Sequence, residues 1–93
     1  MVYNITQHSK KQAKKLNVII KPSINQKKKI DIFDKDGNKI SSIGANGMMD
    51  YGLYLENYGK EYADKRRKLY KIRHARDIAI TGSNGWWADK ILW

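Results

Sequence analysis

The sequence predicts a small α+β domain in which a three-stranded antiparallel meander precedes two helices and a short aromatic C-terminal helix or plug. Apolar and polar residues alternate in short runs up to residue 43, as they do in strands with one buried face. After residue 50, apolar residues recur instead at helical spacing. With 93 residues, 41% of them hydrophobic, the chain has room for one modest core. We expect a basic arm over residues 1–15 and a single domain over residues 16–93.

Positive charge is the dominant compositional feature. The 19 lysines and arginines oppose 9 acidic residues, which gives a formal net charge of +10. Such a balance favours acidic partners: nucleic acid first, then anionic membranes or acidic protein surfaces. The absence of cysteine excludes a disulfide framework and a cysteine-based zinc site. We expect neither a signal peptide nor a membrane span, which favours a reducing compartment or the inside of a particle.

The N-terminal stretch, residues 1–15, shows no sustained apolar period. We interpret it as an arm that is flexible when free and able to lie along a polyanion. A short helix over Ser9–Lys15 and a tail without a role are the alternatives. Its basic side chains are Lys10, Lys11, Lys14 and Lys15.

Three short strands are predicted next. Alternating apolar residues mark Leu16–Lys21 as the first strand, which ends at Pro22. The same alternation marks Lys28–Asp34 as the second, and Lys39–Ile43 is the third. Together they predict an antiparallel meander.

The turn between the second and third strands has the sequence Asp-Gly-Asn at residues 36–38, a strong hairpin signal. With the first two of these residues at the tip, Phe33 pairs with Ile40 and Asp34 pairs with Lys39. Cross-strand pairs of these kinds each contribute roughly 0.2–1 kcal/mol. They are the reason for preferring this register.

The acidic residues around the turn also suggest a calcium loop. Asp34, Asp36 and Asn38 alternate as calcium ligands do. Such a loop, however, needs Gly at its sixth position and Glu at its twelfth, and these positions hold Lys39 and Ala45. A hairpin tip is therefore favoured over a metal site.

No catalytic arrangement stands out in the sequence. His8 lies in the arm and His74 in a basic helix, and neither has an evident orienting partner. The sequence contains no phosphate loop, GxSxG or HExxH pattern. A metal-dependent nuclease would need clustered acids, for which the candidates are Asp31, Asp34, Asp36 and Asp50. We expect no enzyme activity, no cofactor and no metal.

A short helix is predicted between Asp50, a good N-cap, and Gly59, a good C-terminal stop. The Gly-containing stretch Gly44–Gly47 separates it from the sheet. We expect its apolar stripe to pack against the sheet with the hydroxyl groups at the rim, and a base-stacking platform is the alternative. The stripe consists of Tyr51, Tyr54, Leu55 and Tyr58.

A basic helix is predicted over Lys60–Asp77, which lacks Gly and Pro and is rich in helix formers. Tyr62, Leu69 and Ile72, with Tyr70 and Ala63 beside them, fall near one side, which we expect to pack inward. One interpretation is a polyanion-binding helix, and the other is a solvated helix whose arginines partly serve internal contacts. Its cations are Lys65, Arg66, Arg67, Lys68, Lys71, Arg73 and Arg76.

The C-terminal stretch follows apolar residues 78–80 and a loop at residues 81–85. Ser83 or Asn84 can cap a final short helix, which places Trp87 beside Ile91 one turn later. Because indole rings bury a large area, we expect this tail to fold back as a plug on the domain. Docking on a partner is the alternative.

The second half also carries a set of short motifs: Ser42–Gly47, Asp50-Tyr51, Tyr54-Leu55, Arg66-Arg67, Tyr70, Arg73-His74 and Gly85–Trp93. In these motifs the chain resembles a family of short basic proteins of unassigned function encoded by nucleocytoplasmic large DNA viruses, the giant viruses of algae and amoebae. The resemblance covers about residues 28–93 and is most specific in the basic helix and the tail. It implies a viral setting, in the virion or the cytoplasm of the infected host cell, and it offers no catalytic residues. It also implies that some arginines are internal, fixed against Asp50 or the C-terminal carboxylate.

Two functions of different classes remain. In the first, the chain is a non-enzymatic protein that binds nucleic acid, DNA in first place, largely without sequence specificity. In the second, it is a minor capsid or cementing protein that docks on acidic viral proteins or other capsid proteins. Charge favours the first. Its predicted contacts are Lys10, Lys11, Lys14, Lys15, Lys65, Arg66, Arg67, Lys68, Lys71, Arg73 and Arg76.

Overall fold

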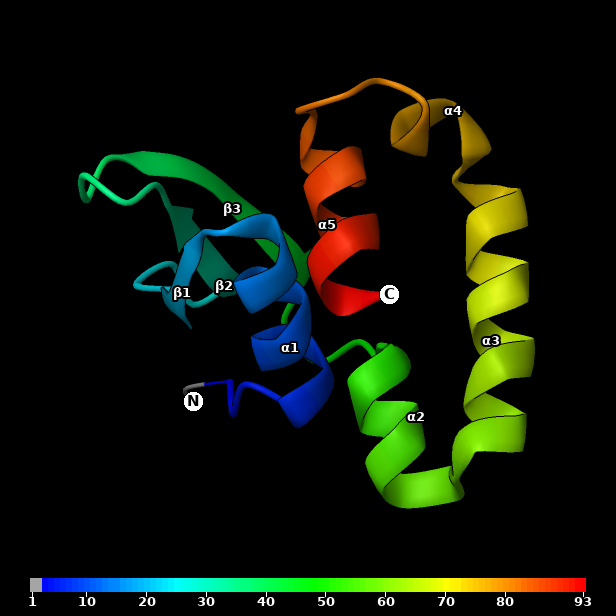
Figure 1. Ribbon diagram of the computed structural model, residues 1–93. Helices are drawn as coiled ribbons and strands as arrows, with labels where there is room; N and C mark the ends of the chain where they lie inside the picture. The colour runs from blue at the N-terminus through cyan, green and yellow to red at the C-terminus, as the bar shows by residue number, and fades with distance from the viewer. Residues whose placement is uncertain (1–2) are drawn as a thin grey trace.

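A computed structural model describes residues 3–93 and confirms the predicted α+β architecture. The elements are α1 (Gln7–Leu16), β1 (Ile19–Pro22), β2 (Lys28–Phe33), β3 (Lys39–Ala45), α2 (Tyr51–Tyr58), α3 (Lys60–Arg73), α4 (Ala75–Ile78) and α5 (Asn84–Leu92). The sheet is antiparallel with the order β1-β2-β3. Figure 1 shows α5 in the middle of the molecule, with the sheet on one side of it and α3 on the other.

Helix α1 stands where most of the basic arm was expected. Thr6 caps its start by accepting a hydrogen bond from the N–H of Ser9 (3.3 Å), and Asn17 ends it in the left-handed conformation (φ 59°). Ser9 and Ala13 are buried, and the Ser9 hydroxyl donates to the carbonyl of Ile91 in α5 (3.0 Å). The prediction of a flexible arm is therefore corrected: the buried side uses small residues, which leave no apolar period in the sequence. Residues 1 and 2 of the arm lie outside the described part of the chain.

The strands form the predicted meander with shifted ends. β1 starts at Ile19, later than expected, because α1 continues to Leu16. β3 extends beyond the predicted end to Ala45. The apolar alternation of the first strand still marks its core side, since Val18 and Ile20 pack against the core.

The predicted hairpin register is wrong. Phe33 pairs with Lys39 instead of Ile40, and the ladder is irregular just before Phe33. Asp34 lies in the loop, where its N–H donates to the carbonyl of Asn38 (2.9 Å) and its carboxylate accepts from the Asn38 N–H (2.9 Å). This side-chain-supported turn is wider than the assumed tip and absorbs the shift in pairing.

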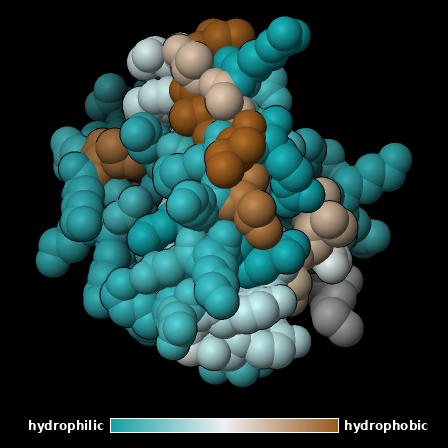
Figure 2. All heavy atoms as spheres, turned by 90° about the vertical axis from the view of Figure 1, so that its right-hand side faces the viewer, coloured by the Kyte–Doolittle hydropathy of each residue, from teal (hydrophilic) through white to brown (hydrophobic). Residues whose placement is uncertain are grey.

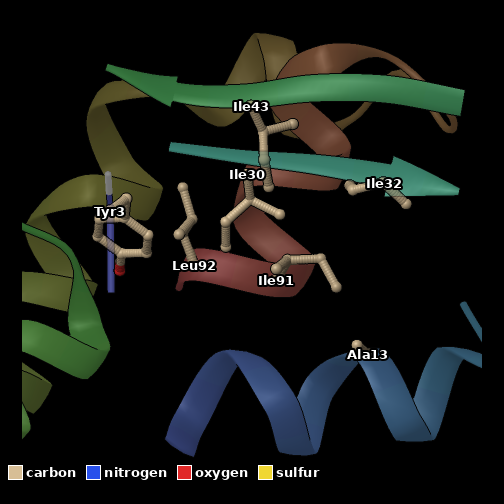
Figure 3. Packing of buried hydrophobic residues seen from close by; sticks show 7 residues of the cluster. All are labelled: Tyr3, Ala13, Ile30, Ile32, Ile43, Ile91 and Leu92. Carbon is tan, nitrogen blue, oxygen red and sulfur yellow. The ribbon is translucent and has the colours of Figure 1, made fainter. Parts of the chain in front are cut away.

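The core lies where α5 and α1 cover the sheet. Figure 3 shows the isoleucine side chains of β2 and β3 pointing toward α5, with α1 below it. Helix α5 starts at Ser83, one of the two predicted caps, whose side chain accepts from the Trp86 N–H (3.1 Å). Because Ile91 and Leu92 of this helix are buried in the core, the prediction that the tail folds back as a plug is confirmed. The buried cluster consists of Tyr3, Ala13, Ile30, Ile32, Ile43, Ile91 and Leu92.

Helix α2 forms as predicted, but its main contacts are with α3 and α1. Asp50 caps it by accepting from the Leu53 N–H (2.9 Å), and Gly59 ends it at φ 89°. Tyr51 is buried and Tyr58 is exposed. The expected packing of the tyrosine stripe on the sheet is wrong, because the turn at Gly59 folds α3 back along α2 and α5 already covers the sheet.

The side of α3 that packs inward is only partly the predicted one. Tyr62, Leu69 and Ile72, which were expected to pack inward, are exposed, whereas Ala63 and Tyr70 are buried. The small Ala63 side chain allows α2 to approach closely, and the ring of Tyr70 faces α5. The helical spacing places all five apolar residues near one side and does not show which of them the rest of the molecule covers.

Two contacts with the C-terminal segment hold α3 in this orientation. The ring of Tyr70 stacks on that of Trp93, with centroids 4.2 Å apart and an angle of 7° between the planes. The ammonium of Lys71 lies 2.6 Å from the carboxylate of Asp89 in α5. The helix is also shorter than predicted, because the chain breaks after Arg73 and continues as α4.

Replacement of Ile91 by Ala tests the role of α5 as the core plug. Because Ile91 is fully buried, we expect a loss of about 2–5 kcal/mol in the free energy of unfolding, measured by urea denaturation. The matched control is Ile24→Ala, since Ile24 is 90% exposed. Equal midpoints for the two variants would contradict the assignment.

Candidate functional site

A cleft with a volume of about 470 Å³ lies between α3 and the rest of the molecule. Residues from β2, β3, α2, α3, α5 and the loop before α2 line it. Aromatic rings form part of its wall, and cations stand at several points of the lining. The residues that matter for its chemistry are Lys29, Tyr54, Arg66, Tyr70, Arg73 and Trp93.

A buried ion pair forms one side of this cleft. The ammonium of Lys29 lies 2.7 Å from the Oδ2 atom of Asp50, and both residues are almost fully buried. The hydroxyl of Tyr3 donates to the same oxygen (2.6 Å), while Oδ1 accepts from the Leu53 N–H. Burial, together with the bond to this carboxylate, raises the pKa of Tyr3, so its hydroxyl remains a donor. The carboxylate thus joins the N-terminal segment, the sheet and α2.

A glycine makes room for Lys29. Gly44 has a positive φ of 78°, and an added Cβ would lie 2.8 Å from the Leu92 Cδ1 atom and 3.0 Å from the Lys29 Cδ atom. Any larger residue would therefore displace either α5 or the lysine stem. The sheet was expected to break at this glycine, but β3 continues through it to Ala45, and the glycine instead leaves room for the stem of Lys29.

The aromatic wall is a chain of ring contacts between α2, α3 and the C-terminal residue. The ring of Trp93 stacks on that of Tyr70, and its centroid lies 6.1 Å from the centroid of the Tyr54 ring. The ring centroids of His74 and Tyr70 lie 4.4 Å apart. The guanidinium of Arg66 lies over the ring of Tyr54, 5.5 Å from its centroid. Burial raises the pKa of Tyr70, so its hydroxyl remains protonated near neutrality. A planar group that carries negative charge matches this combination of rings and cations.

Two of the predicted contact residues serve the fold. Arg67 lies over the ring of Tyr51 (4.1 Å from its centroid) and 3.3 Å from the carboxylate of Asp64. Lys71 pairs with the buried Asp89, as described above. The implied pairing of an arginine with Asp50 does not occur, because Lys29 occupies that carboxylate.

Most of the other predicted contacts are exposed, and none of them forms an ion pair within residues 3–93. Arg66 alone among these residues is half-buried, with its guanidinium over the ring of Tyr54. In Figure 1, helix α1 lies on one side of α5, and helices α3 and α4 lie on the other. We therefore treat the lysines of α1 and the cations of α3 and α4 as two basic surfaces. The exposed residues are Lys10, Lys11, Lys14, Lys15, Lys65, Lys68, Arg73 and Arg76.

Histidine 8 occupies an unusual place that the sequence did not reveal. Its ring lies edge-on to Tyr51, with centroids 4.7 Å apart, and its Nε2 atom is buried without a hydrogen-bond partner among the described residues. Burial lowers its pKa, and the nearby charge of Arg67 adds to the effect. We infer a neutral imidazole at physiological pH.

Sequence reasoning missed Lys29, Tyr3 and Trp93 as members of the site. A lysine in a run of lysines carries no signal that one of them is buried. For Trp93, the abundance of aromatic residues in the tail indicated burial but not the partner ring.

Within residues 3–93, no three histidines or carboxylates gather closely enough to hold a metal ion, and no helix is both long and apolar enough to cross a bilayer. Comparisons with protein-family models, with curated proteins and with solved structures found no match to this chain. The chemistry of the two basic surfaces and the cleft therefore carries the functional argument.

Replacement of Lys29 by Met tests the buried pair. It leaves the Asp50 carboxylate buried without its cation, which we expect to cost about 3–5 kcal/mol of unfolding free energy. Adding Asp50→Asn removes the stranded charge and keeps an N-cap side chain, so the double variant should regain part of the loss in urea denaturation. Lys60→Met, which breaks an exposed pair, should change stability far less. A double variant no more stable than Lys29→Met would contradict the coupling.

The pH dependence of stability tests His8. Because the folded state holds the pKa of His8 below its usual value of 6.5, the unfolded chain binds the proton more readily. Protonation of His8 therefore leaves the free energy of unfolding unchanged above pH 6.5 and lowers it as the pH falls below that value. We expect His8→Gln to flatten this decrease in thermal denaturation curves. The same slope in wild type and His8→Gln would refute the assignment.

Proposed function

We propose that this chain is a non-enzymatic viral protein that binds nucleic acid, DNA in first place, largely without sequence specificity. The observation that supports this most is the set of exposed lysines and arginines on α1, α3 and α4 that have no carboxylate partner within residues 3–93. Such groups lose no internal ion pair when they meet a phosphate. The viral setting, in the virion or the infected cytoplasm, follows from the resemblance described above.

The binding energy would come from phosphate contacts and the release of condensed counterions. The net charge of +10 would also accelerate encounter with a polyanion. Because the two basic surfaces lie on different sides of α5, one strand would contact one surface, or two strands would be bridged. No α-helix within residues 3–93 has the side-chain set of a known base-reading motif, so positioning by phosphates is the dominant mode.

A minor capsid or cementing protein is the second candidate, and a specific observation favours it. Large apolar side chains are exposed along α3, and such a surface suits contact with another protein. The two functions are compatible if the protein lines the inside of a shell.

Salt-dependent binding to a short random-sequence DNA duplex tests the proposal. For Lys10→Gln/Lys14→Gln and for Lys65→Gln/Lys68→Gln, we expect weaker binding by fluorescence anisotropy. The slope of log K against log salt should decrease by up to about 0.9 for each phosphate that the variant no longer neutralises.

The control carries the same charge change away from both helices: Lys27→Gln/Lys35→Gln, whose lysines are exposed in loops. It should keep the wild-type slope. If all three double variants behave alike, only net charge matters and the assigned surfaces are wrong.

A further inference from the structure

The outward side of α3 carries an apolar stripe that nothing in the described chain covers. Ile72 is 65% exposed and Leu69 is 49% exposed, values far from those of packed residues. Figure 2 shows hydrophobic side chains running down this side of the molecule between hydrophilic ones. We call this surface the outer stripe, and it consists of Tyr58, Tyr62, Leu69 and Ile72.

The outer stripe has the geometry of a helix contact surface. With about 3.6 residues per turn, Tyr62, Leu69 and Ile72 fall on one side of α3. The ring of Tyr58, at the end of α2, lies 5.1 Å from that of Tyr62 and extends the stripe by another turn. Helices that dock in grooves or on other helices are recognised through apolar residues at this spacing.

Cations surround and interrupt the stripe. Lys65 falls between Tyr62 and Leu69 on the helical surface, and Lys68 and Arg76 lie nearby on the exposed side. The carboxylate of Asp64, the nearest acid to Lys65 in the sequence, is already paired with Lys60 and Arg67. The outer stripe is thus apolar along its length and positively charged around it.

This combination selects the chemistry of the occupant. A second copy of the chain would bring the same cations against each other, which is repulsive. Nucleic acid would meet the cations but would leave the leucine and isoleucine side chains uncovered. A bilayer would cover the apolar groups but would force the charge of Lys65 toward the acyl region. A helix with apolar residues on one side and carboxylates beside them satisfies both demands.

We propose that the outer stripe docks an amphipathic acidic helix of a partner protein. Apolar side chains of that helix cover Leu69 and Ile72, and its carboxylates pair with Lys65, Lys68 and Arg76. The interaction goes beyond nucleic-acid binding, since it depends on apolar groups that phosphate contacts do not use.

A fluorescent synthetic helical peptide provides the test, with leucines at helical spacing on one side and glutamates beside them. Its control is a peptide of the same composition in scrambled order. We expect the full chain to bind the first peptide at least about tenfold more tightly than the second. Leu69→Ser/Ile72→Ser should remove that preference, and the matched control Ile24→Ser/Ile40→Ser, whose residues are exposed in the sheet region, should keep it.

Each alternative occupant gives its own result. Because Leu69 and Ile72 are both exposed, we expect the Leu69→Ser/Ile72→Ser variant to keep the wild-type circular dichroism spectrum and melting temperature. If this variant unfolds, Lys65→Glu/Lys68→Glu takes its place and must weaken peptide binding. Equal affinity for both peptides overturns the proposal. Three further results overturn it, each in a Leu69→Ser/Ile72→Ser variant that still binds the peptide. They are the loss of binding to phosphatidylglycerol vesicles, the loss of self-association in sedimentation, and the loss of duplex binding. Retained duplex binding together with abolished peptide binding separates this surface from the proposed nucleic-acid contacts.

Discussion

The buried carboxylate of Asp50 is the constraint on which the arrangement of the molecule depends. A carboxylate with 1% exposure is stable only if its lone pairs are satisfied, and here Tyr3, Lys29 and the Leu53 N–H satisfy them. Those three donors belong to the N-terminal segment, β2 and α2. The start of α2 is therefore fixed relative to the sheet, and the direction of the α2–α3 hairpin follows from it.

Helix α5 provides the second fixed point, because its two sides have different tasks. Ile91 and Leu92 face the sheet and complete the core, while Asp89 and Trp93 hold α3 through an ion pair and a ring stack. Helix α3 is thus attached along one side only. The cleft lies under that side, and the outer stripe lies on the other.

The proposed functions follow from this one-sided attachment. Lys71 and Arg67 stabilise the position of α3 and are not free for a ligand. The exposed cations on the same helix are free of partners within the described chain, and they stand beside apolar groups that the core does not use. A helix with both features can contact phosphate and protein, so nucleic-acid binding and attachment within an assembly are compatible properties of one small domain.

The sequence by itself determined the features that depend on a few neighbouring residues: the strands, the cap at Asp50, the stop at Gly59, and the cap at Ser83. The caps and the stop are set by backbone hydrogen bonds and conformational preferences that act within one or two turns, and the strands are marked by their apolar alternation. Only the tertiary structure decided that α3 turns Leu69 and Ile72 outward, that α1 docks through Ala13, and that one lysine of a run is buried. Those choices depend on which distant surface is available to cover each side chain, and the spacing of apolar residues along the chain does not contain that information.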